Sequence, residues 1–118
     1  MVVAGDLNDE QHAATTQILH GPPGSELGTE GFDRPDTGDR QRLWNTAGFI
    51  PADERWSRVY RGRRELIDHI LVSQELIGAV QGATTAGGPV DSIGDQPGTR
   101  RNAAASDHRP IQVALTDA

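Results

Sequence analysis

Leu66-Ile67-Asp68-His69-Ile70-Leu71-Val72-Ser73 is the clearest strand signal in the chain. A carboxylate in the middle of such an apolar strand is costly unless it is paired or hydrogen-bonded. We therefore expect a His or an Arg to contact Asp68. Successive residues of a strand point to opposite faces, so His69 is not that partner and is instead a structural or surface histidine.

The first predicted strand runs into a polar turn. Val2-Val3-Ala4 predicts a short buried strand, and Gly5-Asp6-Leu7-Asn8-Asp9 follows it directly. Asp6 and Asn8 are two residues apart, so together they could hold a water molecule and a phosphate oxygen. In the alternative interpretation, the acidic and amide side chains of this turn only cap a helix over residues 10–19.

A third polar block, Ser106-Asp107-His108-Arg109-Pro110, comes directly before the last predicted strand. Asp107 could bind a hard cation through oxygen. His108 could be the group that meets Asp68, because a carboxylate behind an imidazole fixes its tautomer and supports its positive form. Alternatively, the block is a loop turn in which Ser106 acts as a local cap.

The rest of the pattern predicts a mixed chain with more strand than helix. The further elements are a short helix over residues 41–47, a hairpin formed by Val59-Tyr60, a turn over residues 61–64 and the strand over residues 66–73, and strands over residues 80–85 and 111–115. Long loops separate these elements, and loops of such length often carry function.

Composition narrows the classes of function. The chain has 118 residues, enough for one domain or part of one, and it contains no Cys, which excludes disulfides and thiolate metal sites. No apolar run reaches membrane-spanning length and no signal-peptide pattern is present, so we expect a cytoplasmic protein by default. The net charge of −6 argues against non-specific electrostatic binding to nucleic acid, but a site built around a divalent cation must be locally acidic.

The three polar blocks, in this order, resemble the motifs of a known family. Residues 5–9 (GDLND), 65–73 (ELIDHILVS) and 106–111 (SDHRPI) are similar to the C-terminal motifs of the endonuclease/exonuclease/phosphatase superfamily, which includes the deoxyribonuclease-like enzymes. The resemblance implies an α/β (α+β) fold that is part of a four-layered α/β sandwich, with mixed β-sheets and outer helices.

The resemblance also implies a role for each residue of the site. Asp6 orients or deprotonates the attacking water, and Asn8 helps to hold that water or an oxygen of the phosphate. Asp107 is a metal ligand. His108 contacts the scissile phosphate, and Asp68 buttresses His108. Because the candidate ligands are oxygen atoms and Cys is absent, Mg²⁺ is the expected ion, with Mn²⁺ as a substitute.

Family members are normally longer, and the motif at residues 5–9 lies past their midpoint. The resemblance therefore implies that residues 1–118 are the C-terminal part of a single domain whose N-terminal half is missing. That half carries an Asn and a Glu, the latter a principal metal ligand. We expect a start codon assigned too far downstream, or a split or degraded gene, and a chain that self-associates or pairs with a separate N-terminal half.

Arginine supplies all 11 basic side chains. Arg suits bidentate phosphate contacts, although GC-rich coding explains the same bias. Arg61, Arg63 and Arg64 could grip a substrate phosphate, but solvated turn residues are the simpler interpretation. Arg101 lies in the loop before Ser106, which we expect to approach the site, and it is a candidate substrate-binding residue.

Three functions stay open at this point. The first, which we favour, is a metal-dependent phosphodiesterase that acts on nucleic acid as an endonuclease or exonuclease. The second is a phosphatase or lipid phosphodiesterase on the same scaffold, acting on inositol phosphates or sphingomyelin. The third is a non-catalytic fragment that serves as an interaction module. The fold alone does not separate them.

Overall fold

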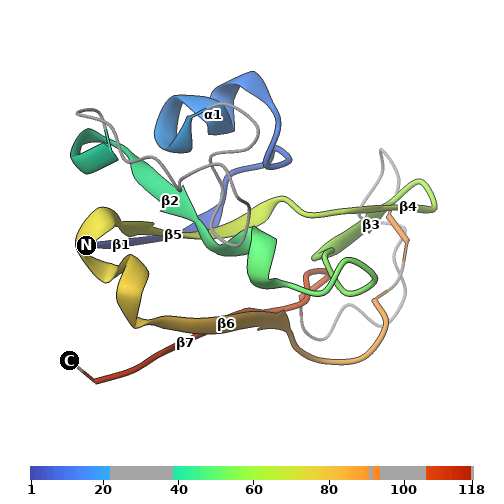
Figure 1. Ribbon diagram of the computed structural model, residues 1–118. Helices are drawn as coiled ribbons and strands as arrows, with labels where there is room; N and C mark the ends of the chain where they lie inside the picture. Colours follow the sequence, from blue (N-terminus) through green and yellow to red (C-terminus); the bar gives the residue numbers. More distant parts are fainter. Residues whose placement is uncertain (22–38, 91, 94–105, 118) are drawn as a thin grey trace.

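A computed structural model describes residues 1–21, 39–90, 92–93 and 106–117 (Figure 1). In these ranges the strands pair antiparallel in three small sheets, and the architecture is α+β. The helical elements are α1 (Ala14–His20) and the 3₁₀ helices η2 (Asp39–Gln41), η3 (Thr46–Phe49) and η4 (Gln74–Ala79). The strands are β1 (Val2–Asp6), β2 (Leu43–Asn45), β3 (Arg58–Tyr60), β4 (Arg63–Glu65), β5 (Asp68–Ser73), β6 (Val80–Thr85) and β7 (Ile111–Leu115).

The strand β5 is the centre of the main sheet. It pairs antiparallel with β1 on one side and with β2 on the other. Leu71 and Val72 are neighbours in β5, so their side chains point to opposite faces, and both are fully buried. The centre of the sheet is therefore covered on both faces, which is why this strand is almost continuously apolar in the sequence.

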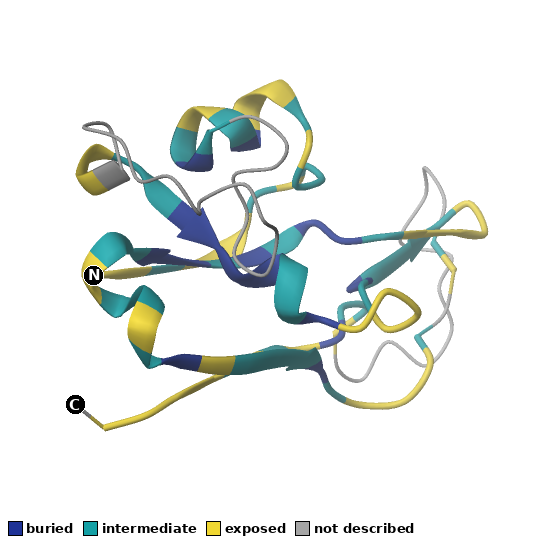
Figure 2. Cartoon of the chain, viewed as in Figure 1, coloured by how far each residue is buried: buried dark blue, intermediate teal, exposed yellow. Residues whose placement is uncertain are grey.

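The main sheet lies between α1 on one side and the β6–β7 sheet on the other (Figure 1). Trp44, Val72 and Val80 form a buried cluster between the two sheets. A second buried cluster includes Ile50 and Leu66, against which the β6–β7 sheet also packs. Buried residues gather where β2, β5 and the segment after β2 meet (Figure 2).

The strands β3 and β4 form a hairpin whose loop is Arg61-Gly62. These two residues have φ angles of 48° and 79°. Two positive φ angles in a two-residue loop are typical of a type I′ turn, whose twist matches that of the flanking strands. The predicted hairpin is therefore present, but the prediction that residues 66–73 form its second strand is wrong. The partner of β3 is Arg63–Glu65, a polar segment with no apolar residue to mark a strand, and β5 pairs elsewhere.

The short helix predicted over residues 41–47 is wrong. Leu43–Asn45 form the strand β2 instead, between η2 and η3. Trp44 stands opposite Val72 in the main sheet and is 1% exposed. The Asn45 side chain accepts a hydrogen bond from the Ala47 backbone N–H at 2.9 Å and so caps η3. Pairing with β5 and burial of Trp44 outweigh the helical preference of this segment.

The N-terminal elements also differ from expectation. The helix α1 begins only at Ala14, because Ala13 is extended with a ψ of 147°, and no side chain caps this helix. The strand β1 is confirmed, but it is not buried: Val2 is 50% exposed, since β1 lies at the edge of the main sheet. The four-layered sandwich and the missing N-terminal half stay predictions.

Candidate active site

The carboxylate of Asp68 contacts the imidazole of His108. Asp68 opens β5, and His108 lies in the turn before β7, 40 residues further along the chain. The Asp68 Oδ2 and His108 Nδ1 atoms are 2.6 Å apart, and each side chain is about one-fifth exposed. The imidazole donates from Nδ1 to the carboxylate, which leaves Nε2 for other contacts. The expected His partner of Asp68 is confirmed.

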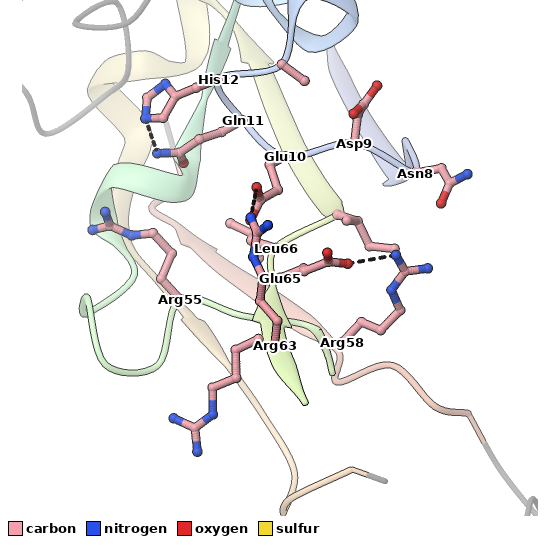
Figure 3. A pocket seen from close by; sticks show the side chains of 13 residues that line it. Asn8, Asp9, Glu10, Gln11, His12, Arg55, Arg58, Arg63, Glu65 and Leu66 are labelled. Carbon is pink, nitrogen blue, oxygen red and sulfur yellow. Dashed lines mark hydrogen bonds and ion pairs between the residues drawn. The ribbon is translucent and has the colours of Figure 1, made fainter. Parts of the chain in front are cut away.

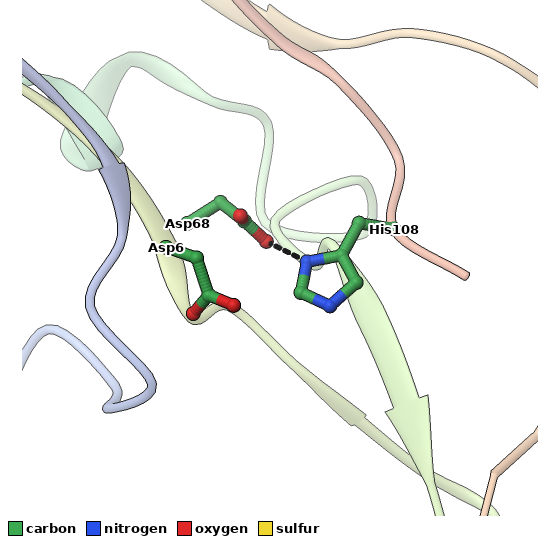
Figure 4. A group of neighbouring side chains, drawn as sticks. All are labelled: Asp6, Asp68 and His108. Atoms are coloured by element: carbon green, nitrogen blue, oxygen red, sulfur yellow. Dashed lines mark hydrogen bonds and ion pairs between the residues drawn. The ribbon is translucent and has the colours of Figure 1, made fainter. Parts of the chain in front are cut away.

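Asp6 joins this pair from the neighbouring strand. Asp6 and Asp68 are directly opposite one another in the β1–β5 register, so their side chains share a face of the sheet. One ligand atom from each of Asp6, Asp68 and His108 lies within 4.8 Å of the other two (Figure 4). Two carboxylates at opposed positions repel one another. The arrangement therefore favours a cation near the two carboxylates.

The polar turn after β1 fixes the position of the Asp6 carboxylate. Asp6 Oδ1 accepts a hydrogen bond from the Asn8 backbone N–H at 2.8 Å, an Asx turn. Asn8 has a φ of 55°, a left-handed conformation that Asn tolerates better than most residues. Neither side chain caps α1, which begins further on. The turn instead holds Asp6 in place and presents Asn8 beside it.

Asp107, the predicted metal ligand, lies in the turn before β7. Asp107 Oδ1 is 4.0 Å from His108 Nε2. Ser106 Oγ accepts a hydrogen bond from the His108 backbone N–H at 3.0 Å, so the predicted local cap is also present. The contact of His108 with Asp68 and the local cap by Ser106, which were expected as alternatives, are therefore both present in this turn. Arg101 lies outside the residues that the structure describes.

Ser57 connects the two halves of this site and was missed in the sequence. It is fully buried, and its Oγ lies 3.2 and 3.3 Å from the backbone N–H groups of Ile67 and Asp68, from which it accepts. Its carbonyl oxygen accepts a hydrogen bond from the Arg109 backbone N–H at 2.7 Å. One residue therefore holds the start of β5 beside the turn that carries His108. A serine after Trp56 gives no sequence signal for this role.

His69 is structural, as one of the two expected interpretations had it, and it is 2% exposed. Its Nε2 donates to the Asp9 carbonyl at 2.7 Å, and its Nδ1 accepts from the Asn45 amide at 3.1 Å. Burial lowers the pKa of His69 below its ordinary value, and the Asp9 carbonyl and the nearby carboxylates, Asp68 first, oppose this only in part. A neutral His69 thus anchors the turn that carries Asn8.

A comparison with protein-family models matches residues 1–108 to the endonuclease/exonuclease/phosphatase family. The chain belongs to this family. No curated protein and no solved structure matches it. Enzymes of the endonuclease/exonuclease/phosphatase family are generally phosphodiesterase- or phosphatase-type hydrolases. In the described part of the chain, no helix is long and apolar enough to cross a membrane.

Members of the endonuclease/exonuclease/phosphatase family typically use divalent metals. The donors that meet here are the carboxylates of Asp6 and Asp68 and the imidazole of His108, with Asp107 beside the imidazole. Carboxylate oxygens suit a hard divalent cation, and the chain has no thiolate to favour a softer one. The residues present therefore fit such an ion. Asp107, the metal ligand predicted from the sequence, lies outside the group formed by Asp6, Asp68 and His108. This arrangement was not predicted from the sequence.

Proposed function

We propose that this chain carries the chemistry of a divalent-metal-dependent phosphodiesterase that acts on nucleic acid. The observation that carries the proposal is the convergence of Asp6, Asp68 and His108 from β1, β5 and the turn before β7. Family membership points to the same kind of hydrolysis. The combination supplies a base, a charged hydrogen-bond donor and a carboxylate that orients the donor.

Each residue has a distinct part in the proposed reaction. The Asp6 carboxylate accepts a proton from the attacking water while the oxygen of this water bonds to phosphorus. Asn8 holds this water or a phosphate oxygen. His108 donates from Nε2 to a phosphoryl oxygen, where negative charge increases. Asp68 is a positioning residue, since its bond to Nδ1 fixes the ring tautomer and stabilises the imidazolium form. The phosphorus–oxygen bond to the leaving group breaks, the leaving oxygen takes up a proton from the solvent, and Asp6 returns the proton of the attacking water to the solvent.

In the proposal, Asp107 is the principal metal ligand from this chain, and Asp6 lies where it could share the ion. The expected ion is Mg²⁺, with Mn²⁺ as a substitute. When bound, such a cation neutralises charge on the phosphate and lowers the pKa of a bound water.

Hydrolysis assays on the purified chain test the proposal. Supercoiled plasmid DNA and bis(p-nitrophenyl) phosphate are incubated with Mg²⁺, with Mn²⁺ and with EDTA. We expect metal-dependent cleavage of both, lost in His108→Ala and in Asp107→Asn and kept in Asp117→Asn, an exposed aspartate outside the site. Release of phosphate from inositol phosphates with no cleavage of DNA would support the alternative substrate class. Absence of hydrolysis together with absence of Mg²⁺ binding in calorimetry would support the interaction module.

A further inference from the structure

An arginine-lined cleft lies next to the candidate active site. It has a volume of about 560 Å³ and runs from the turn after β1 to the β3–β4 hairpin (Figure 3). Its charged lining consists of the carboxylates of Asp9, Glu10 and Glu65 and the guanidinium groups of Arg55, Arg58, Arg63 and Arg64. The whole chain has 17 acidic and 11 basic residues. Arginine therefore predominates in the cleft of a chain in which acidic residues predominate overall.

Two of these arginines are held by the protein itself. Arg58 pairs with Glu65 at 2.7 Å, and both side chains are less than one-fifth exposed. Arg55 donates to the Ile50 carbonyl at 2.7 Å and to the Gly48 carbonyl at 3.3 Å. These contacts engage one Nη of Arg58, and Nε and one Nη of Arg55, in the wall of the cleft.

The other two arginines are exposed and available. Arg63 pairs with Glu10 at 2.7 Å, but the side chains are 67% and 45% exposed, and such surface pairs contribute little to stability. Arg64 lies with its guanidinium 4.5 Å from the centre of the Trp56 ring. Stacking on an aromatic face leaves the edge of a guanidinium accessible to a phosphate. A phosphate could therefore replace the Glu10 carboxylate on Arg63 at low cost.

The cleft is joined to the catalytic residues through the backbone. Asn8 lines one end of it, and Ile67, which directly precedes Asp68, lines it too. The Leu7 N–H donates to the Ile67 carbonyl at 2.9 Å, which continues the β1–β5 pairing into the cleft. A nucleic-acid strand whose scissile phosphate lies at His108 would thus pass Asn8 and reach the β3–β4 hairpin.

We propose that this cleft, through Arg63 and Arg64, binds a backbone phosphate of a nucleic-acid strand that flanks the phosphate to be cleaved. The inference rests on the proposed function, because it assigns a polymeric phosphodiester substrate to the same site. Glu10 occupies Arg63 in the absence of substrate and competes with the phosphate.

Binding without hydrolysis tests the cleft. The anisotropy of a fluorescein-labelled single-stranded oligonucleotide of about 12 nucleotides is titrated with the full chain in EDTA. We expect the Arg63→Gln/Arg64→Gln variant to bind at least about fivefold more weakly, and the slope of log affinity against log salt to fall by about 1.4, for two lost contacts to a single strand. The control is Arg61→Gln, which removes one positive charge from the same hairpin outside the cleft, whereas the double variant removes two. We expect its Kd to stay within about twofold of that of the unmodified chain.

The Glu10→Gln variant distinguishes phosphate binding by Arg63 from a purely structural role of the Arg63–Glu10 ion pair. Removal of the competing carboxylate should tighten oligonucleotide binding about two- to fivefold, although it deletes an ion pair. Equal losses in the Arg61 and Arg63/Arg64 variants, weaker binding by the Glu10 variant, or no binding by the unmodified chain would each overturn the proposal. Binding as expected without any hydrolysis contradicts only the proposed function. Hydrolysis of DNA with binding unchanged in the Arg63/Arg64 variant contradicts only the cleft.

Discussion

Asp68 Oδ2 lies 2.6 Å from His108 Nδ1, although the two residues are 40 positions apart in the chain. Ser57 holds the two segments together, since it bonds both to the start of β5 and to Arg109, the residue after His108. In the proposed function, this carboxylate orients the imidazole and does not contact the substrate. Its removal should therefore affect the rate of the reaction more than the binding of substrate.

Asp68→Asn tests this positioning role. The amide cannot stabilise an imidazolium and can select the wrong tautomer, so we expect kcat for bis(p-nitrophenyl) phosphate to fall about 10²- to 10⁴-fold, with KM little changed. The measurement is steady-state kinetics, together with the thermal midpoint as a check of folding. A KM that rises with kcat unchanged would contradict the assigned role.

Asp6→Asn should separate stability from activity. Asp6 and Asp68 are opposed across β1 and β5, so neutralising one removes a repulsion. In EDTA we expect the free energy of unfolding to increase by about 0.2–1 kcal/mol, while hydrolysis is lost. Urea unfolding measures the first quantity. Asp53→Asn makes the same charge change at an exposed position. It therefore shows how much of the increase in the free energy of unfolding comes from the net charge of −6 alone. An equal gain in both variants would argue against local repulsion.

Ser57→Ala should destabilise the site from inside the fold. The substitution leaves the backbone N–H groups of Ile67 and Asp68 without their acceptor in a buried position. We expect a loss of about 1–3 kcal/mol in the free energy of unfolding and slower hydrolysis through displacement of Asp68. The control is Ser92→Ala, since Ser92 Oγ accepts a backbone N–H from Gly62 at an exposed place. A loss in the control as large as that in Ser57→Ala would contradict the buried role.

His69 should make folding sensitive to mild acid. Its pKa is lowered by burial in the folded state, so the unfolded chain binds the proton more readily. The stabilisation from neutral His69 is complete above the ordinary pKa of about 6.5 and is lost as the pH falls from there through the lowered value. Urea unfolding across this range should show a shallower pH dependence in His69→Gln. His12→Gln, at an exposed position, should keep the slope of the unmodified chain; equal slopes in all three proteins would refute the assignment.

The exposed edge of β1 should promote association between chains. An edge strand with an uncovered apolar residue is a template for pairing, and Val2 is 50% exposed. We expect light scattering to show a mass that rises with concentration, and Val2→Lys to reduce that rise. Ile18→Lys, at a residue of α1 that is 83% exposed, is the control for a general gain in solubility. A single monomeric species at every concentration would refute the expectation.

The sequence by itself determined the strands β5, β6 and β7 and the identity of the polar groups. The pattern over residues 66–73 predicted β5, and the need to compensate a carboxylate within it predicted a His or Arg beside Asp68. The strands β6 and β7 have the predicted bounds. These inferences succeed because burial of apolar side chains and the cost of an unpaired charge act at the level of single residues.

Only the tertiary structure decided which segments pair and which distant groups meet. Residues 41–47 have a helical pattern, yet residues 43–45 form β2 because β5 offers hydrogen bonds and Trp44 fills the space between the sheets. The opposed carboxylates of Asp6 and Asp68, the link through Ser57 and the arginine cleft depend on strand register and on contacts between distant residues. Register is set by the packing of the whole sheet, so no local pattern contains it.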